Sequence, residues 1–77
     1  MITLGDLLKI INNNKQMYIE TREEETNALL DWWYGTPGLL SSTKEIKSIR
    51  YAYVDEIKVD NEGEIVITIL FDTEGQK

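Results

Sequence analysis

The chain is short and acidic, and it contains neither cysteine nor histidine. Its 77 residues leave room for one domain with one core, and 42% hydrophobic with 29% charged residues is typical of a globular protein. Fourteen acidic residues against eight basic ones give a net charge of −6. This charge argues against nucleic acid or anionic lipid as a direct partner, because both are polyanions, and it favours a protein with a basic surface.

Neither the start of the chain nor its apolar runs carry a targeting or membrane signal. No run approaches the roughly 20 consecutive apolar residues that a membrane-spanning helix needs. Residues Met1 to Asp6 lack the basic segment followed by an apolar stretch that marks a secretory signal. We therefore expect a cytoplasmic protein. Without disulfide bonds, a domain this small depends on close packing or on oligomerisation for its stability.

The first third of the chain predicts a helix followed by a strand. The helix is indicated by aliphatic residues at helical spacing: Leu4, Leu7, Leu8 and Ile11. Thr3 is a suitable N-cap, and the three asparagines 12–14 end the helix. From Lys15 to Arg22 the period changes to two, with Met17, Ile19 and Thr21 on one face, which predicts a half-buried strand.

The segment from residue 23 to residue 34 has two interpretations. In the first, residues 23–27 form a polar hairpin tip and residues 28–34 return as a strand with Leu30, Trp32 and Tyr34 on one face. In the second, Thr21 caps a helix from Glu23 to Trp33 that Gly35 ends. The preference of aromatic residues for strands favours the hairpin.

The second half of the chain predicts a helix and a second hairpin. Residues 35–38 carry Gly, Pro and Gly and indicate a loop. Ser42 with Glu45 forms a capping box that opens a short helix through about residue 49, with Ile46 and Ile49 inward. A strand at 51–60, a turn at 61–63 and a central strand at 64–71, buried on both faces, follow before a frayed polar tail from Asp72.

Together these elements predict an α+β fold in one domain spanning residues 1–77. An N-terminal helix and a short second helix pack on one face of a four-stranded, largely antiparallel sheet made of two hairpins.

No pattern of residues predicts catalysis, a metal site or a cofactor. Catalytic triads and zinc sites built on histidine or cysteine are impossible here. The acids at 60, 62 and 64 superficially suggest a calcium loop, but Ile65 and Phe71 stand where that loop needs glycine and glutamate. The acid-x-lysine spacing of Glu56 and Lys58 occurs in some metal-dependent nucleases, and it recurs at Glu45 and Lys47. The recurrence on a different kind of element makes the spacing a weak signal. We interpret Glu56 and Lys58 as a surface ion pair along a strand, and we expect no enzyme.

The first hairpin contains the candidate partner-binding residues. Its aromatic members are Trp32, Trp33 and Tyr34, and its acidic members are Glu20, Glu23, Glu24, Glu25 and Asp31. If the segment is a strand, neighbouring side chains point to opposite faces, so one tryptophan packs in the core while the other is exposed as an interface anchor. The acids either imitate a row of DNA phosphates, to dock on a basic groove, or only keep the hairpin tip soluble.

The opening Leu4-Gly5-Asp6-Leu7-Leu8 and the hairpin from Glu56 to Ile67 resemble small accessory proteins of phages and integrative elements of low-GC Gram-positive bacteria. Some small acidic phage proteins with a similar opening inhibit host defence, including anti-CRISPR proteins that occupy the DNA-binding surface of an effector nuclease. The resemblance implies a protein in the host cytoplasm that binds and modulates or inhibits a host protein. The alternative is a structural or assembly protein that forms a homo-oligomer, such as a homodimer, through a sheet edge and the Trp33 side.

Overall fold

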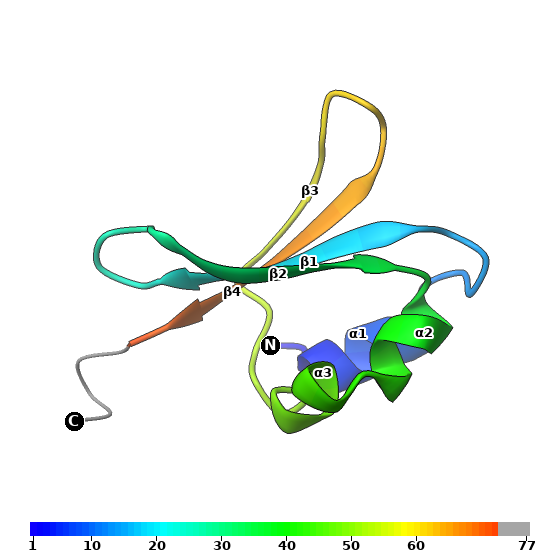
Figure 1. Cartoon of the computed structure of the whole chain (residues 1–77), viewed down its shortest axis with the longest axis horizontal. Coiled ribbons are helices and arrows are strands. Elements are labelled where there is room, and N and C mark those ends of the chain that lie inside the picture. Colours follow the sequence, from blue (N-terminus) through cyan, green and yellow to red (C-terminus); the bar gives the residue numbers. More distant parts are fainter. Residues whose placement is uncertain (73–77) are drawn as a thin grey trace.

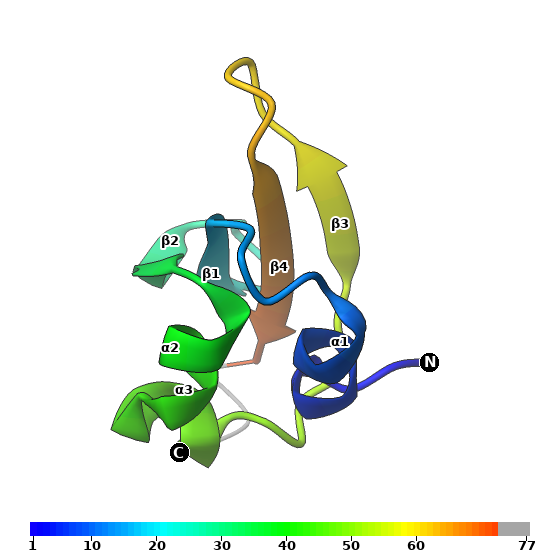
Figure 2. The same cartoon turned by 90° about the vertical axis from the view of Figure 1, so that its right-hand side faces the viewer.

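Helices lie against one face of a four-stranded sheet and leave the other face uncovered (Figure 1; Figure 2). The structure is a computed structural model and describes residues 1–72. None of the helices within these residues is long and apolar enough to span a membrane. In chain order the elements are α1 (Leu4–Ile10), β1 (Met17–Glu23), β2 (Leu29–Gly35), α2 (Pro37–Ser42), α3 (Lys44–Ser48), β3 (Glu56–Val59) and β4 (Ile65–Phe71).

The segment after β1 is a hairpin, so the strand interpretation of residues 28–34 is confirmed. β2 pairs antiparallel with β1, from Met17 opposite Gly35 to Arg22 opposite Leu29. The tip turns through Asn27, whose φ of 61° is tolerated by asparagine. The competing helix would leave β1 without this partner strand. Local sequence allowed both, and the pairing with β1 decides between them.

The four strands lie in the order β2-β1-β4-β3. The two hairpins, β1–β2 and β3–β4, are antiparallel, as predicted, and they join through a parallel pairing of β1 with β4 that aligns Ile19 with Ile67. β4 is therefore a central strand, and Val66 to Ile69 are all buried. The predicted α+β class and largely antiparallel sheet are confirmed.

The hydrophobic core fills the space between the helices and the sheet. The predicted helix at residue 4 is confirmed, with the Thr3 hydroxyl oxygen accepting a hydrogen bond of 3.2 Å from the Asp6 N–H. Removing these aliphatic side chains from water is the main force that holds the helices on the sheet. The buried core residues are Leu4, Leu7, Leu8, Met17, Ile19, Leu40, Ile46, Ile67 and Ile69.

The expected loop at residues 35–38 is instead the end of β2 at Gly35 and the start of α2 at Pro37. Thr36 caps α2 by accepting a hydrogen bond of 3.3 Å from the Leu39 N–H, and Pro37 occupies the first helical turn. Proline is favoured there because its missing N–H has no partner to lose. The predicted Ser42 capping box is also wrong, since the Ser42 hydroxyl donates to the Gly38 carbonyl, and Thr43 precedes α3.

The predicted strand at residues 51–60 is too long, because only residues 56–59 pair with β4. The preceding segment makes its backbone hydrogen bonds with the start of the chain. The Leu4 N–H donates to the Ala52 carbonyl over 2.8 Å, and the Val54 N–H donates to the Ile2 carbonyl over 2.9 Å. The turn at 61–63 is confirmed, with Gly63 at a φ of 82°. The expected frayed tail lies, beyond Asp72, outside the described residues.

The packing of α1 leads to a first prediction. Leu8→Ala removes a side chain that is 6% exposed, and we expect it to lower the free energy of unfolding by about 2–5 kcal/mol. Ile10→Ala, on the same helix but 72% exposed, is the matched control and should change it by about 0.5 kcal/mol or less. Urea unfolding followed by circular dichroism measures both. Equal effects would show that α1 does not bury the Leu8 face.

Candidate functional site

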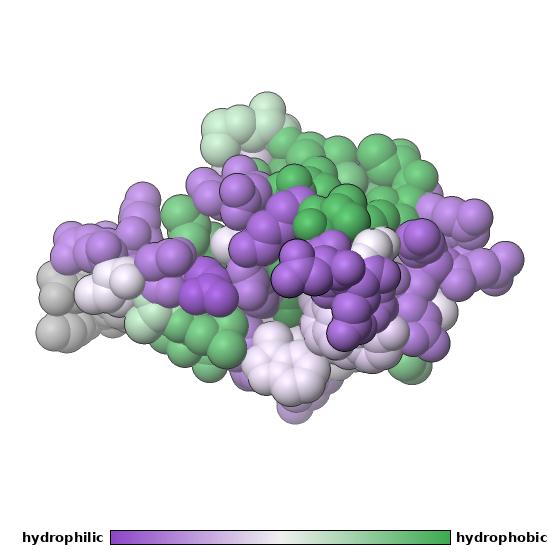
Figure 3. Space-filling view, turned by 90° about the horizontal axis from the view of Figure 1, so that it is seen from above, coloured by the Kyte–Doolittle hydropathy of each residue, from purple (hydrophilic) through white to green (hydrophobic). Residues whose placement is uncertain are grey.

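The sheet face opposite the helices, here called the open face, carries half-buried side chains of β1 and exposed side chains of β2, and no described helix covers it (Figure 2). Exposed apolar and aromatic residues lie on the two edge strands. Figure 3 shows hydrophilic residues across the middle of this side of the molecule, with hydrophobic areas to either side. The exposed apolar and aromatic residues of β2 are Leu29, Leu30, Trp32 and Tyr34. Those of β3 are Ile57 and Val59, which lie on the helix side of the sheet because they pair with Ile67 and Ile65.

Three aromatic rings form a patch on the open face, here called the aromatic patch: Tyr18, Trp32 and Tyr34. Tyr18 lies on β1 opposite Tyr34 on β2, and their ring centroids are 4.5 Å apart. Trp32 lies two residues before Tyr34 on β2, and its ring centroid is 6.1 Å from that of Tyr18. These separations are typical of attractive aromatic pairs, so the rings hold one another in place although they face water.

The two tryptophans point to opposite faces of the sheet, as the strand pattern predicted. Trp33 points to the helix side, where it is partly buried against the core, while Trp32 is 55% exposed. Neighbouring residues of a strand point to opposite faces, which explains the difference. Trp32 is therefore the tryptophan that a partner can reach.

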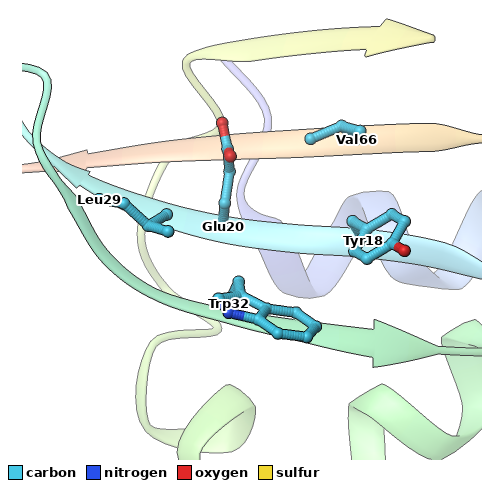
Figure 4. Close-up of a pocket in the computed structure, with 5 residues that line it drawn as sticks. All are labelled: Tyr18, Glu20, Leu29, Trp32 and Val66. Carbon is cyan, nitrogen blue, oxygen red and sulfur yellow. The ribbon is translucent and has the colours of Figure 1, made fainter. Parts of the chain in front are cut away.

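A hollow of about 420 Å³ lies beside Trp32 on the open face (Figure 4). Its lining includes Leu29, which the strand pattern had placed on the opposite face from Trp32. The register of β1 with β2 shifts between Thr21 and Arg22, and this bulge brings Leu29 round to the Trp32 side. The lining is mainly apolar and consists of Tyr18, Glu20, Leu29, Trp32 and Val66.

The Glu20 carboxylate bridges three strands instead of projecting into solvent. Arg22 donates to both of its oxygens, over 3.0 and 3.2 Å, and the Thr68 hydroxyl on β4 donates over 2.7 Å. The Lys58 ammonium on β3 lies 3.9 Å away. In Figure 4 the carboxylate points away from Trp32. The hydrogen bond from Arg22 is the main cause that lowers the pKa of Glu20, against the opposing effect of burial.

The other predicted acids fall into two groups. Glu23 is buried, and its carboxylate accepts a hydrogen bond of 2.7 Å from the Glu25 N–H, so it shapes the hairpin tip. Glu24 and Glu25 are exposed at that tip. Asp31 is also exposed, with one carboxylate oxygen accepting from the Trp32 N–H over 2.8 Å. The acids available on the surface of this hairpin are thus Glu24, Glu25 and Asp31.

A further acid, Glu64, borders the aromatic patch at the opposite end from the tip. The Tyr34 hydroxyl donates to a Glu64 carboxylate oxygen over 2.7 Å, and this hydrogen bond raises the pKa of Tyr34 to about 12. Neither Tyr18 nor Glu64 was among the predicted site residues. The period of two placed Tyr18 on the solvent face of β1, but only the strand pairing brings it beside Trp32.

The remaining polar motifs have structural roles. One Asp60 carboxylate oxygen accepts hydrogen bonds of 2.9 Å from the N–H groups of Glu62 and Glu64, so this acid shapes the turn. Lys58 lies 4.0 Å from Glu56, in agreement with an ion pair along the strand. Within residues 1–72 there is no group of three or more acids placed to hold a metal ion.

Comparison with known proteins gives no relative for this chain. No protein-family model, curated protein or solved structure matches it. The candidate site therefore depends on its own geometry alone.

The Glu20 network leads to a second prediction, on pH. Because the folded state lowers the pKa of Glu20, this carboxylate stabilises the fold above its unfolded pKa, and the contribution is lost as pH falls through the folded value. Glu20→Gln should therefore lower stability near neutral pH and make it fall less steeply between about pH 5 and pH 3. Glu24→Gln, at the exposed tip, is the control. Urea midpoints against pH measure the difference, and parallel profiles for Glu20→Gln and the parent would contradict it.

Proposed function

We propose that the protein is a binding module that docks on a protein with a basic surface through the aromatic patch. The observation that carries the proposal is the exposure of Trp32 on a sheet face that no described helix covers, next to an apolar hollow. Tryptophan and tyrosine dominate the binding energy of many protein interfaces, because their large rigid surfaces lose little conformational entropy on binding. The hollow is large enough to take an apolar side chain of the partner.

The distribution of exposed acids supports a basic partner. Glu24 and Glu25 lie at the tip of the first hairpin, and Glu64 borders the patch beyond Tyr34. Asp31 pairs with Thr21 and so lies on the helix side of the sheet. Glu20 contributes little to this field, since Arg22 and Lys58 offset its charge. Acids around an apolar centre favour fast encounter with a basic surface, while the aromatic centre supplies the lasting contact.

The biological setting is part of the proposal and depends on the sequence resemblance alone. In that setting the chain is a small protein of a phage or mobile element, and its partner is a host protein whose activity it modulates or inhibits, such as a host-defence nuclease. A nuclease that binds nucleic acid has the basic groove that an acidic, aromatic surface complements.

The third prediction tests the aromatic patch. The partner is first captured from a host lysate with the parent protein and identified by mass spectrometry. Trp32→Ala should then speed dissociation from the purified partner and weaken binding by about 2 kcal/mol or more, a roughly 30-fold loss. Tyr51→Ala, which removes an aromatic ring that is 73% exposed outside the patch, is the control and should bind as the parent does. Surface plasmon resonance separates the two rates.

The fourth prediction tests the exposed acids. Glu24→Gln with Glu25→Gln should slow association and flatten its dependence on salt, because these charges act before contact. Dissociation should hardly change. Glu23 is left intact because its carboxylate shapes the tip. Association rates at several salt concentrations measure the effect. If the double variant associates like the parent at every salt concentration, the tip only keeps the protein soluble.

A further inference from the structure

Strand β3 is exposed along its whole length, whereas each of the other strands contains at least one buried residue. All four of its residues are exposed, and Ile57 and Val59 reach 51% and 66%. Ile57 pairs with the core residue Ile67, so its side chain lies on the helix side but beyond the cover that the helices give. Figure 2 shows β3 at the outer edge of the sheet with no strand beyond it. An apolar edge of this kind is unusual for a strand that has no further partner.

The free edge of β3 presents backbone groups at alternate residues. In an antiparallel pair, residues alternate between bonding to the partner strand and directing their N–H and C=O away from it. The Asp60 N–H donates to the Glu64 carbonyl over 2.9 Å, which continues the register of Val59 with Ile65. By this alternation, the backbone groups of Ile57 and Val59 point away from β4. These are the groups that an added strand would bond.

The start of the chain limits where a strand can be added. The Val54 N–H donates to the Ile2 carbonyl, and Thr3 forms an antiparallel bridge with Tyr53. The edge before residue 55 is therefore already occupied. After Val59 the chain enters the turn at 61–63. The Asp55 N–H also points toward β4, since it donates to the Thr68 carbonyl over 2.9 Å. The free edge consequently runs from residue 56 to residue 59, and its outward backbone groups are those of Ile57 and Val59.

We propose that β3 pairs antiparallel with β3 of a second copy of the chain, around a twofold axis at Ile57. In this register Ile57 meets the Ile57 of the other copy, and their free backbone groups bond to each other. On the open face, Glu56 of each copy then lies opposite Lys58 of the other copy. The twofold axis thus creates two pairs of opposite charge across the dimer interface. Shifting the axis to Val59 instead opposes Glu56 with Glu62, which is unfavourable.

This dimer leaves the aromatic patch free. β2 and β3 are the two opposite edge strands of the sheet. Pairing through β3 therefore joins the two sheets edge to edge and places one aromatic patch near each outer edge of the combined sheet. The two copies would then present two binding surfaces to one partner or to two partners. This goes beyond the proposed function, because the dimer and the binding of a partner use different strands and fail independently.

Charge reversal on β3 tests the dimer and its register together. Sedimentation velocity on the parent should show a monomer–dimer equilibrium in the micromolar range. Glu56→Lys alone and Lys58→Glu alone each place like charges opposite each other, and each should weaken self-association by roughly tenfold or more. An equimolar mixture of the two variants should recover dimers, because each lysine then faces a glutamate of the other variant.

The repeated acid-x-lysine spacing on α3 supplies the matched controls. Glu45→Lys and Lys47→Glu make the same charge changes away from β3 and should dimerise as the parent does. Circular dichroism checks that every variant is folded, and recovery in the mixture cannot arise from misfolded chains. A parent that stays monomeric up to millimolar concentration would overturn the proposal. So would β3 variants that dimerise like the parent, or a mixture that remains monomeric.

Discussion

The amount of helix available is the constraint on which the rest of this structure depends. Within residues 1–72 the three helices contain 7, 6 and 5 residues, and they cover only one face of a four-stranded sheet. The core therefore lies on one side, and the other face must be built from side chains that tolerate water. Aromatic rings with polar tips and an ion-pair network meet this requirement. The same shortage of cover leaves Ile57 and Val59 exposed at the β3 edge.

The acids of the open face and of the adjoining hairpin tip have two different roles, one in stabilising the fold and one in the proposed recognition of a partner. Glu20 holds β1, β4 and β3 together through Arg22, Thr68 and Lys58, and within residues 1–72 no buried side-chain nitrogen or oxygen lacks a hydrogen-bond partner. The network keeps a polar centre ordered beside the aromatic patch. The charges free to meet a partner lie further out, on the hairpin tip. This arrangement separates what stabilises the sheet from what we propose a partner contacts.

Local sequence patterns predicted the elements whose conformation depends on residues close to them in the chain. The helix at residue 4, the alternation in β1 and the Gly63 turn follow from spacing and from backbone preference. The parallel pairing of β1 with β4 was out of reach, because it aligns Glu20 with Thr68, 48 residues away. The hollow depends on that pairing and on a bulge that no local pattern marks. The α2 helix was missed because Pro37 was interpreted as a breaker and not as a first-turn residue.

Acrylamide quenching of the two tryptophans tests most directly the central claim, that the sheet is covered on one face only. Trp33→Phe leaves Trp32 as the single emitter, and Trp32→Phe leaves Trp33. The structure predicts clearly stronger quenching of Trp32, because it lies on the uncovered face, than of Trp33, which packs against the core. Equal quenching, or stronger quenching of Trp33, would contradict both the covered face and the exposure of the aromatic patch.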